Sequence, residues 1–128
     1  MWPAVAAVSP GSSAAIAKYL SGRDAAPSAD GPRHLVEAGK KIFEDGVPDS
    51  NVPACAGCHG PEAHGQDQMP RLAGQSYQYV VNQLNEWQQG LRSKDPADPS
   101  NENTMVPIAK ALTKEQGKAV AAYLSYQR

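Results

Sequence analysis

The chain has 128 residues, a formal net charge of −1 and a hydrophobic content of 41%, which together indicate one small domain. Acidic and basic residues are interspersed, which argues against a nucleic-acid partner, and no apolar run reaches the roughly 18 residues that a membrane-spanning helix needs. With one Phe and two Trp for its core, a domain of this size is expected to need a covalent staple or a bound group.

The N-terminal third of the sequence predicts two helices joined by a linker. Residues 10–21 should form a helix, with Ser9 as the N-cap and a proline at the first helical position. The stretch RDAAPSADGP is typical of a linker and falls within residues 22–32. Residues 33–46 have apolar side chains at helical spacing, and this second helix should end at Gly46.

The C-terminal half predicts two more helices with a turn-rich loop between them. Residues 76–92 carry one apolar stripe, made of Val80, Leu84, Trp87 and Leu91. The polar run DPADPSNEN, residues 95–103, is typical of a loop. The last helix, residues 113–128, should begin with Thr113 as N-cap and Gln116 in the capping-box position. No segment alternates convincingly between apolar and polar residues, so we predict an all-α fold.

The two cysteines of the chain lie three apart in CAGCH, residues 55–59, and a histidine follows directly. A disulfide is the simplest interpretation. A CxxC redox pair usually belongs to a βαβ pattern, and no strand is predicted before this one. A zinc site needs about four ligands, and the remaining histidines, His34 and His64, are not in finger-like spacing. Covalent haem accounts for the whole motif, because the two thiols can bond both vinyl groups while His59 reaches the iron.

Four spaced motifs within residues 33–128 are typical of one protein family. They are VPACAGCHGPEAHGQ, PRLAGQSYQYVVNQLNEWQQGLR, MVPIAKALT and AAYLS. Together they resemble a class I cytochrome c, and in detail the C-terminal domain of a dihaem protein of the cytochrome c4 type. The resemblance implies a monohaem domain over residues 33–128, with helices packed around one covalently bound haem c and its iron.

The resemblance also implies roles for individual residues around the iron. Cys55 and Cys58 match the thioether cysteines, and His59 matches the proximal iron ligand. Pro70 matches the proline whose carbonyl accepts a hydrogen bond from the axial histidine. Such a bond fixes the tautomer of the ring and strengthens it as a ligand.

Further matches concern the haem wall and the helix crossing. Leu72 matches a residue of the haem wall, and Arg71 and Gln75 belong to the same PRLAGQ motif, with Arg71 expected near a propionate. Gly39 matches the point at which the first helix of the family crosses the last helix, here at Tyr123. Glycine suits this point because it has no Cβ to keep the two backbones apart.

Three side chains after CAGCH could supply the sixth iron ligand: Met69, Met105 and His64. The family places its methionine in an extended loop before the last helix, where Met105 lies and where Pro107 would stiffen the chain. We therefore expect Met105 to be the ligand and Met69 to be a buried gap-filler. His34 and His64 are expected at the solvated surface.

The resemblance implies a one-electron carrier rather than an enzyme. Two strong axial ligands leave no open coordination site, and a thioether ligand raises the reduction potential. We expect redox proteins of a respiratory chain as donor and acceptor, docking at a rim of small residues, Ala54, Ala56 and Gly57, beside the haem edge. Two alternatives are a haem enzyme with a displaceable sixth ligand, and a module or subunit of a periplasmic dehydrogenase or sulfur-oxidising enzyme.

The first 21 residues resemble the segment that starts at Met105. At an offset of 104, eight of these 21 positions are identical without a gap. We interpret residues 1–21 as the axial-methionine loop and last helix of a preceding cytochrome domain, and residues 22–32 as the linker. The apolar face of this arm would lack its own core, which leaves it open to a dimer contact. The resemblance further implies a periplasmic location, with export directed by upstream sequence.

Overall fold

The computed structural model describes residues 6–23, 26–92 and 104–128. Within these ranges the regular elements are helices, and the pairings between extended residues are two isolated bridges, which confirms the predicted all-α class. The α-helices are α2 (Pro10–Ser21), α3 (Val36–Asp45), α4 (Ala56–His59), α5 (Tyr77–Gln88), α6 (Met105–Ala111) and α7 (Lys114–Tyr126). Two short 3-10 turns, Arg33–Leu35 and Pro48–Ser50, precede α3 and α4. None of the helices described is long and apolar enough to cross a membrane.

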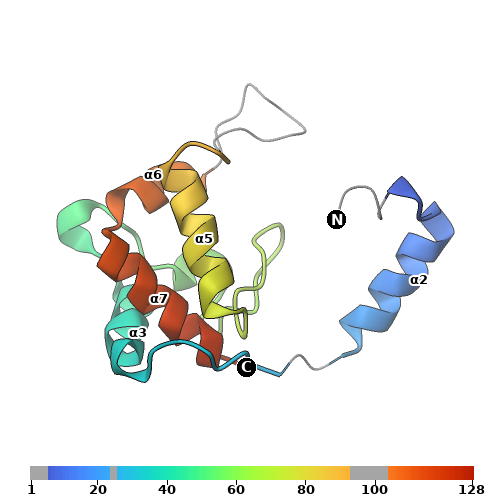
Figure 1. The fold of residues 1–128 in the computed structure, drawn as a ribbon, viewed down its shortest axis with the longest axis horizontal. Helices are drawn as coiled ribbons and strands as arrows, with labels where there is room; N and C mark the ends of the chain where they lie inside the picture. The colour runs from blue at the N-terminus through green and yellow to red at the C-terminus, as the bar shows by residue number, and fades with distance from the viewer. Residues whose placement is uncertain (1–5, 24–25, 93–103) are drawn as a thin grey trace.

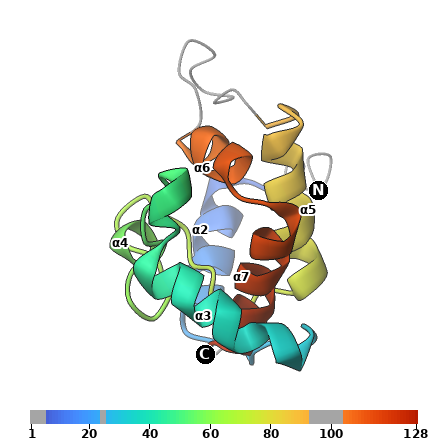
Figure 2. The same ribbon diagram turned by 90° about the vertical axis from the view of Figure 1, so that its left-hand side faces the viewer.

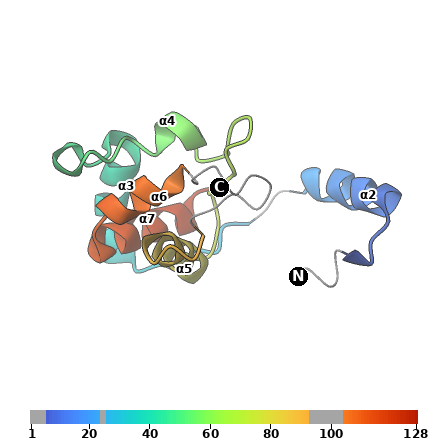
Figure 3. The same cartoon turned by 90° about the horizontal axis from the view of Figure 1, so that it is seen from above.

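Helix α2 lies apart from the remaining helices (Figures 1 and 3). It has the bounds predicted from the sequence, since Ser9 Oγ accepts a hydrogen bond from the backbone of Ser12 at 3.2 Å and Pro10 occupies the first turn. None of its residues is buried, and Ile16 and Leu20 are 49% and 59% exposed. Met1, which corresponds to Met105 in the sequence repeat, lies outside the described ranges.

The core forms where α3 crosses α7, as predicted (Figure 2). A Cβ atom at Gly39 would lie 1.9 Å from the carbonyl oxygen of Ala119, so only glycine allows this approach. One turn further along α3, the ring of Phe43 is fully buried and its centroid lies 5.4 Å from that of Tyr123. Helix α3 then ends at Gly46, which has φ +75° and caps it as expected.

Helix α7 begins at the predicted capping box. Thr113 Oγ1 accepts a hydrogen bond from the Gln116 amide at 3.1 Å, and Gln116 Oε1 accepts one from the Thr113 amide at 2.8 Å. Helix α5 packs beside α7 but is shorter than predicted, because Gly90 takes φ +74° just after it. Leu91 is consequently 72% exposed and does not belong to the buried stripe.

The extended loop expected around Met105 is in fact a helix, α6. Pro107 lies in its first turn, where the missing amide proton costs nothing because that amide has no partner within the helix. The side-chain amide of Gln88 on α5 holds the other end of α6 by donating to the carbonyls of Ala109 at 2.8 Å and Leu112 at 3.0 Å. The predicted loop over residues 95–103 lies outside the described ranges.

Candidate functional site

A cavity of about 460 Å³ lies between the CAGCH segment, residues 68–75, α5 and α6. Its volume falls within the range of small-molecule and cofactor pockets. The predicted site residues that line it are Cys55, Cys58, His59, Pro70, Leu72, Gln75 and Met105. Its walls also contain apolar side chains from three helices, namely Val80, Leu84, Ile108 and Val120. The fold therefore gathers in one cavity residues that are widely separated in sequence.

The single turn of α4 brings the two cysteines to the same wall of the cavity. The amides of Cys58 and His59 donate to the carbonyl of Cys55 at 3.2 and 2.9 Å, which closes the turn. Residues three apart share one face of a helical turn, so both thiols are directed to the same side. Cys58 is exposed, Cys55 is half-buried, and the two sulfurs are not joined in a disulfide. Burial raises the pKa of the Cys55 thiol.

His59 is the residue whose chemistry is most tightly fixed. Its ring is 5% exposed, and Nδ1 lies 2.9 Å from the carbonyl oxygen of Pro70. A carbonyl oxygen only accepts hydrogen bonds, so Nδ1 must carry the proton. The other nitrogen, Nε2, then has its lone pair available for a metal.

The segment that carries Pro70 is itself anchored to α4. Gln66 and Met69 pair through two backbone hydrogen bonds of 3.2 and 2.8 Å, and the Gln66 side chain donates to the carbonyl of Gly57 at 3.0 Å. This short turn places Met69 at the edge of the cavity, where it is 39% exposed. The expectation that Met69 is a buried gap-filler is therefore wrong, because the turn holds it at the surface.

Arg71 is not among the residues that line the cavity, and its expected place near a haem propionate stays a prediction. Its Nε donates to the carbonyl of Ala73 at 3.2 Å, and its own carbonyl accepts a hydrogen bond from Gln75 at 2.7 Å. The side chain is thus turned along the loop rather than toward the cavity.

Trp87 and Arg92 also line the cavity. From the sequence, Trp87 was expected only on an apolar stripe, and no site role was predicted for Arg92. The indole Nε1 of Trp87 is buried, and no hydrogen-bond partner for it occurs among the described atoms. The Arg92 guanidinium carbon lies 4.6 Å above the Trp87 ring, and the same side chain hydrogen bonds to Gln83. A buried indole N–H normally needs a hydrogen-bond acceptor. A tryptophan on the predicted apolar stripe therefore already indicated that an acceptor should lie close to it.

Two candidates for the sixth ligand remain, Met105 and His64, and they lie in different surroundings. Met105 is partly buried and lines the cavity from the first turn of α6. His64 does not line it; its ring contacts the carbonyl of Arg128, and Nδ1 lies 3.4 Å from a carboxylate oxygen of Glu62. His34 and His64 are both exposed, as expected.

The donor set fits a large organic group that contains a metal. The cavity offers two thiols, one imidazole nitrogen, two thioether sulfurs and one unpaired indole N–H within largely apolar walls. By contrast, the described residues contain no cluster of three or more His, Cys, Asp or Glu side chains that could hold a bare metal ion. An iron macrocycle with acidic substituents would use the two thiols, the imidazole, one of the two thioethers and the indole N–H, whereas a zinc ion would not.

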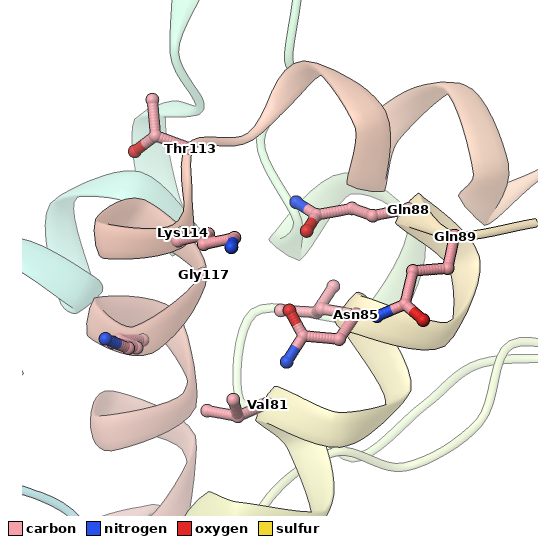
Figure 4. Close-up of a pocket in the computed structure, with 9 residues that line it drawn as sticks. Val81, Asn85, Gln88, Gln89, Thr113, Lys114 and Gly117 are labelled. Atoms are coloured by element: carbon pink, nitrogen blue, oxygen red, sulfur yellow. The ribbon is translucent and has the colours of Figure 1, made fainter.

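A second cavity, of about 340 Å³, lies between α5 and the start of α7 (Figure 4). Polar side chains surround it, including Asn85, Gln88, Gln89 and Lys114. None of the predicted site residues reaches it. We therefore assign the functional site to the larger cavity, where the reactive side chains converge.

Known proteins resemble this chain in sequence and in fold. Residues 36–127 match the family model for cytochrome c. The chain is 38% identical over 127 residues to cytochrome c-552 of Acidithiobacillus ferridurans, covering 98% of this chain and 51% of that protein. The chain spans about half the length of the curated relatives it matches.

Two solved structures resemble the fold. The cytochrome c4 of Acidithiobacillus ferrooxidans matches with a TM-score of 0.80 and 36% identity, over 98% of this chain and 70% of that one. The thiosulfate dehydrogenase of Marichromatium purpuratum matches with a TM-score of 0.78 and 32% identity, over 94% of this chain and 25% of that one.

Proposed function

Because the chain belongs to the cytochrome c family and is an electron carrier related to cytochrome c4, we propose that it holds one low-spin haem c between His59 and Met105. The observation that carries this proposal is the hydrogen bond between His59 Nδ1 and the Pro70 carbonyl, beside two thiols on one helical turn. This arrangement presents Nε2 to the cavity as a neutral ligand with a fixed direction.

Several cavity residues would together hold the haem. Cys55 and Cys58 would form the two thioether bonds, and His59 and Met105 would supply a nitrogen and a sulfur ligand to the iron. When bound, the haem would supply an iron that gains and loses one electron. The Met105 thioether would stabilise the reduced state and so raise the potential relative to two histidine ligands. Leu72 and the apolar side chains of α5 would exclude water from the macrocycle.

Trp87 offers a partner for an acidic substituent of the haem. Its buried indole N–H lacks an acceptor in the described structure, and a propionate oxygen would satisfy it. The positive charge of Arg92, stacked on the same ring, would stabilise the propionate as an anion.

We further propose that residues 1–21 belong to a preceding cytochrome domain. Ser9 caps α2 at the position that corresponds to Thr113 at the start of α7. The exposed Ile16 and Leu20 correspond to Val120 and Leu124, which are buried. The match of cytochrome c-552 of Acidithiobacillus ferridurans to 98% of this chain over 51% of its own length supports the same interpretation.

The proposed setting is the periplasm, where the carrier would exchange electrons with protein partners. The rim of small residues beside Cys58, made of Ala54, Ala56 and Gly57, carries no charged side chain and would form a small docking surface. A second candidate function is that of a haem module in a thiosulfate-oxidising enzyme. The structural similarity to a thiosulfate dehydrogenase favours this candidate.

A redox titration of the purified haem protein, followed by its visible spectrum, tests the proposal. We expect one reversible one-electron transition with low-spin spectra in both states. The reduced protein should not bind carbon monoxide at neutral pH, because Met105 fills the sixth position. Ready binding of carbon monoxide would instead support a haem enzyme with an open site. Reduction of the purified haem protein by thiosulfate, with no other protein present, would support the second candidate.

A further inference from the structure

Residues 28–31, here called the strap, are bound firmly to the haem domain although the sequence suggests a linker. The amide and the hydroxyl of Ser28 both donate to the carbonyl of Gly74, at 3.1 and 2.9 Å. The amide of Ala29 donates to the carbonyl of Ser125 at 2.7 Å. The strap therefore joins the turn that follows Leu72 to the C-terminal end of α7.

Gly31, at the C-terminal end of the strap, lies directly against α7. Its amide donates to the buried Ser125 hydroxyl at 3.2 Å, and its carbonyl accepts a hydrogen bond from Tyr126 at 2.8 Å. A Cβ atom at Gly31 would lie 2.8 Å from the Cα of Ala122. Ala29 has φ +49°, a conformation that a non-glycine residue keeps only where surrounding bonds impose it.

Between these contacts, Asp30 caps the N-terminus of α5. One carboxylate oxygen accepts a hydrogen bond from the Tyr77 amide at 2.9 Å, and the other accepts one from the Ser76 hydroxyl at 3.0 Å. Ser76 occupies the N-cap position but makes no capping bond with its own side chain. A carboxylate in this place satisfies an otherwise unpaired amide and complements the helix dipole. The lowered pKa of Asp30, due first to the Tyr77 amide, agrees with this role.

The element that Asp30 caps is a wall of the haem cavity. Helix α5 contributes Tyr79, Val80, Gln83, Leu84 and Trp87 to the lining. Gly74, which accepts both hydrogen bonds from Ser28, lies between the lining residues Leu72 and Gln75. Both attachment points of the strap are thus segments that shape the cavity.

Resting on the haem site proposed above, we propose that the strap is part of the haem domain and that Asp30 is a positioning residue for the α5 wall. Loss of its carboxylate frees the first turn of α5 and changes the surroundings of the haem, while the α3–α7 crossing stays intact.

The test compares Asp30→Ala, Asp30→Asn and the control Asp49→Asn in the haem-loaded protein. Asparagine keeps an oxygen that can accept the Tyr77 amide, whereas alanine does not. Asp49, an exposed residue in the turn Pro48–Ser50, loses the same charge without touching α5. The readouts are site-resolved amide hydrogen exchange and the midpoint potential.

In Asp30→Ala, we expect exchange at residues 77–80 to accelerate about tenfold, with α3 unchanged, and the midpoint potential to shift. Asp30→Asn should restore both values, and Asp49→Asn should match the wild type. Equal potential shifts in Asp30→Ala and Asp30→Asn would show a charge effect and overturn the positioning role. Unchanged exchange at residues 77–80 would overturn it as well. Absence of a reversible couple in the wild type would refute the haem proposal instead, and the exchange data would still decide the role of the strap.

Discussion

The ring of His59 and the carbonyl of Pro70 are joined by a hydrogen bond of 2.9 Å, across a cavity wall built from two separate segments. The bond determines which ring nitrogen carries the proton. Because Gln66 ties the Pro70 segment to Gly57 beside the histidine, the acceptor and the ring are held by the same small unit. Two neighbouring segments of this chain therefore fix the direction in which Nε2 of His59 points.

The two cavity methionines should be separable by mutation. Met105→Ala is expected to abolish the weak near-infrared band of ferric iron bound to a thioether and to lower the midpoint potential. Met69→Ala should leave that band intact and cost at most about 1 kcal/mol of stability, because its side chain is partly exposed. Spectra of the two variants decide the assignment, and loss of the band in Met69→Ala alone would reverse it.

The thiols of α4 should be required for retention of the haem. Replacement of both Cys55 and Cys58 by alanine is expected to leave no haem in the protein after extraction with acidic organic solvent. Without it the chain should lose most of its helical circular dichroism, since the group completes the core. Each single variant is the matched control and should keep one thioether bond. A double variant that stays helical and unfolds cooperatively would contradict this view.

The α3–α7 crossing should tolerate no side chain at Gly39. Gly39→Ala places a Cβ atom 1.9 Å from a backbone oxygen, so we expect a loss of about 3 kcal/mol in the free energy of unfolding. Gly57→Ala is the control, because no atom lies within 4 Å of its Cβ position. Denaturant unfolding of both variants measures the difference. Similar stability of the two would mean that the helices can separate without cost.

The N-terminal arm should be dispensable for the haem but not for self-association. Deletion of residues 1–21 leaves the strap in place, so the visible spectrum and the midpoint potential should stay unchanged. The exposed Ile16 and Leu20 are removed, and any dimer population in sedimentation should fall. A large spectral change would show that the arm belongs to this haem pocket.

The contribution of Asp30 to stability should depend on pH. Its folded-state pKa lies below the ordinary value of 3.8, first because the Tyr77 amide donates to the carboxylate. The part of the stabilisation that depends on the charge is therefore complete above about pH 4 and is lost as the pH falls through the folded-state pKa. Thermal unfolding of the wild type and of Asp30→Ala should differ at pH 7, and the difference should narrow toward pH 2. A constant difference would show that the charge plays no part.

The sequence was sufficient where a local rule fixes the structure. The CAGCH turn, the capping box at Thr113 and the glycine at the helix crossing each depend on residues whose spacing has few alternatives. The fold class followed from the resemblance and from helical periodicity. These features confirm that the haem domain could be outlined from the sequence.

The remaining features depend on contacts between distant segments. Pro107 suggested a loop, yet it fits the first turn of α6, because proline suits a helix start as well as a loop. Asp30 caps α5 by accepting the amide of Tyr77, which lies 47 residues later in the sequence, and no local pattern predicts a contact over such a separation. The polar roles of Trp87 and Arg92 likewise arise only once α5 forms a wall of the cavity.

The crossing of α3 and α7 has a consequence for the order of events during biosynthesis. The two helices flank the CAGCH segment from opposite sides in the sequence, so the thiols leave the ribosome well before α7 is complete. Contacts between such distant segments form slowly, because a long loop must close first. Until α7 docks at Gly39, the largest interface of the domain is missing and the cavity has one wall fewer. If haem is attached at CAGCH as proposed, the segment would be most accessible while α7 is still undocked.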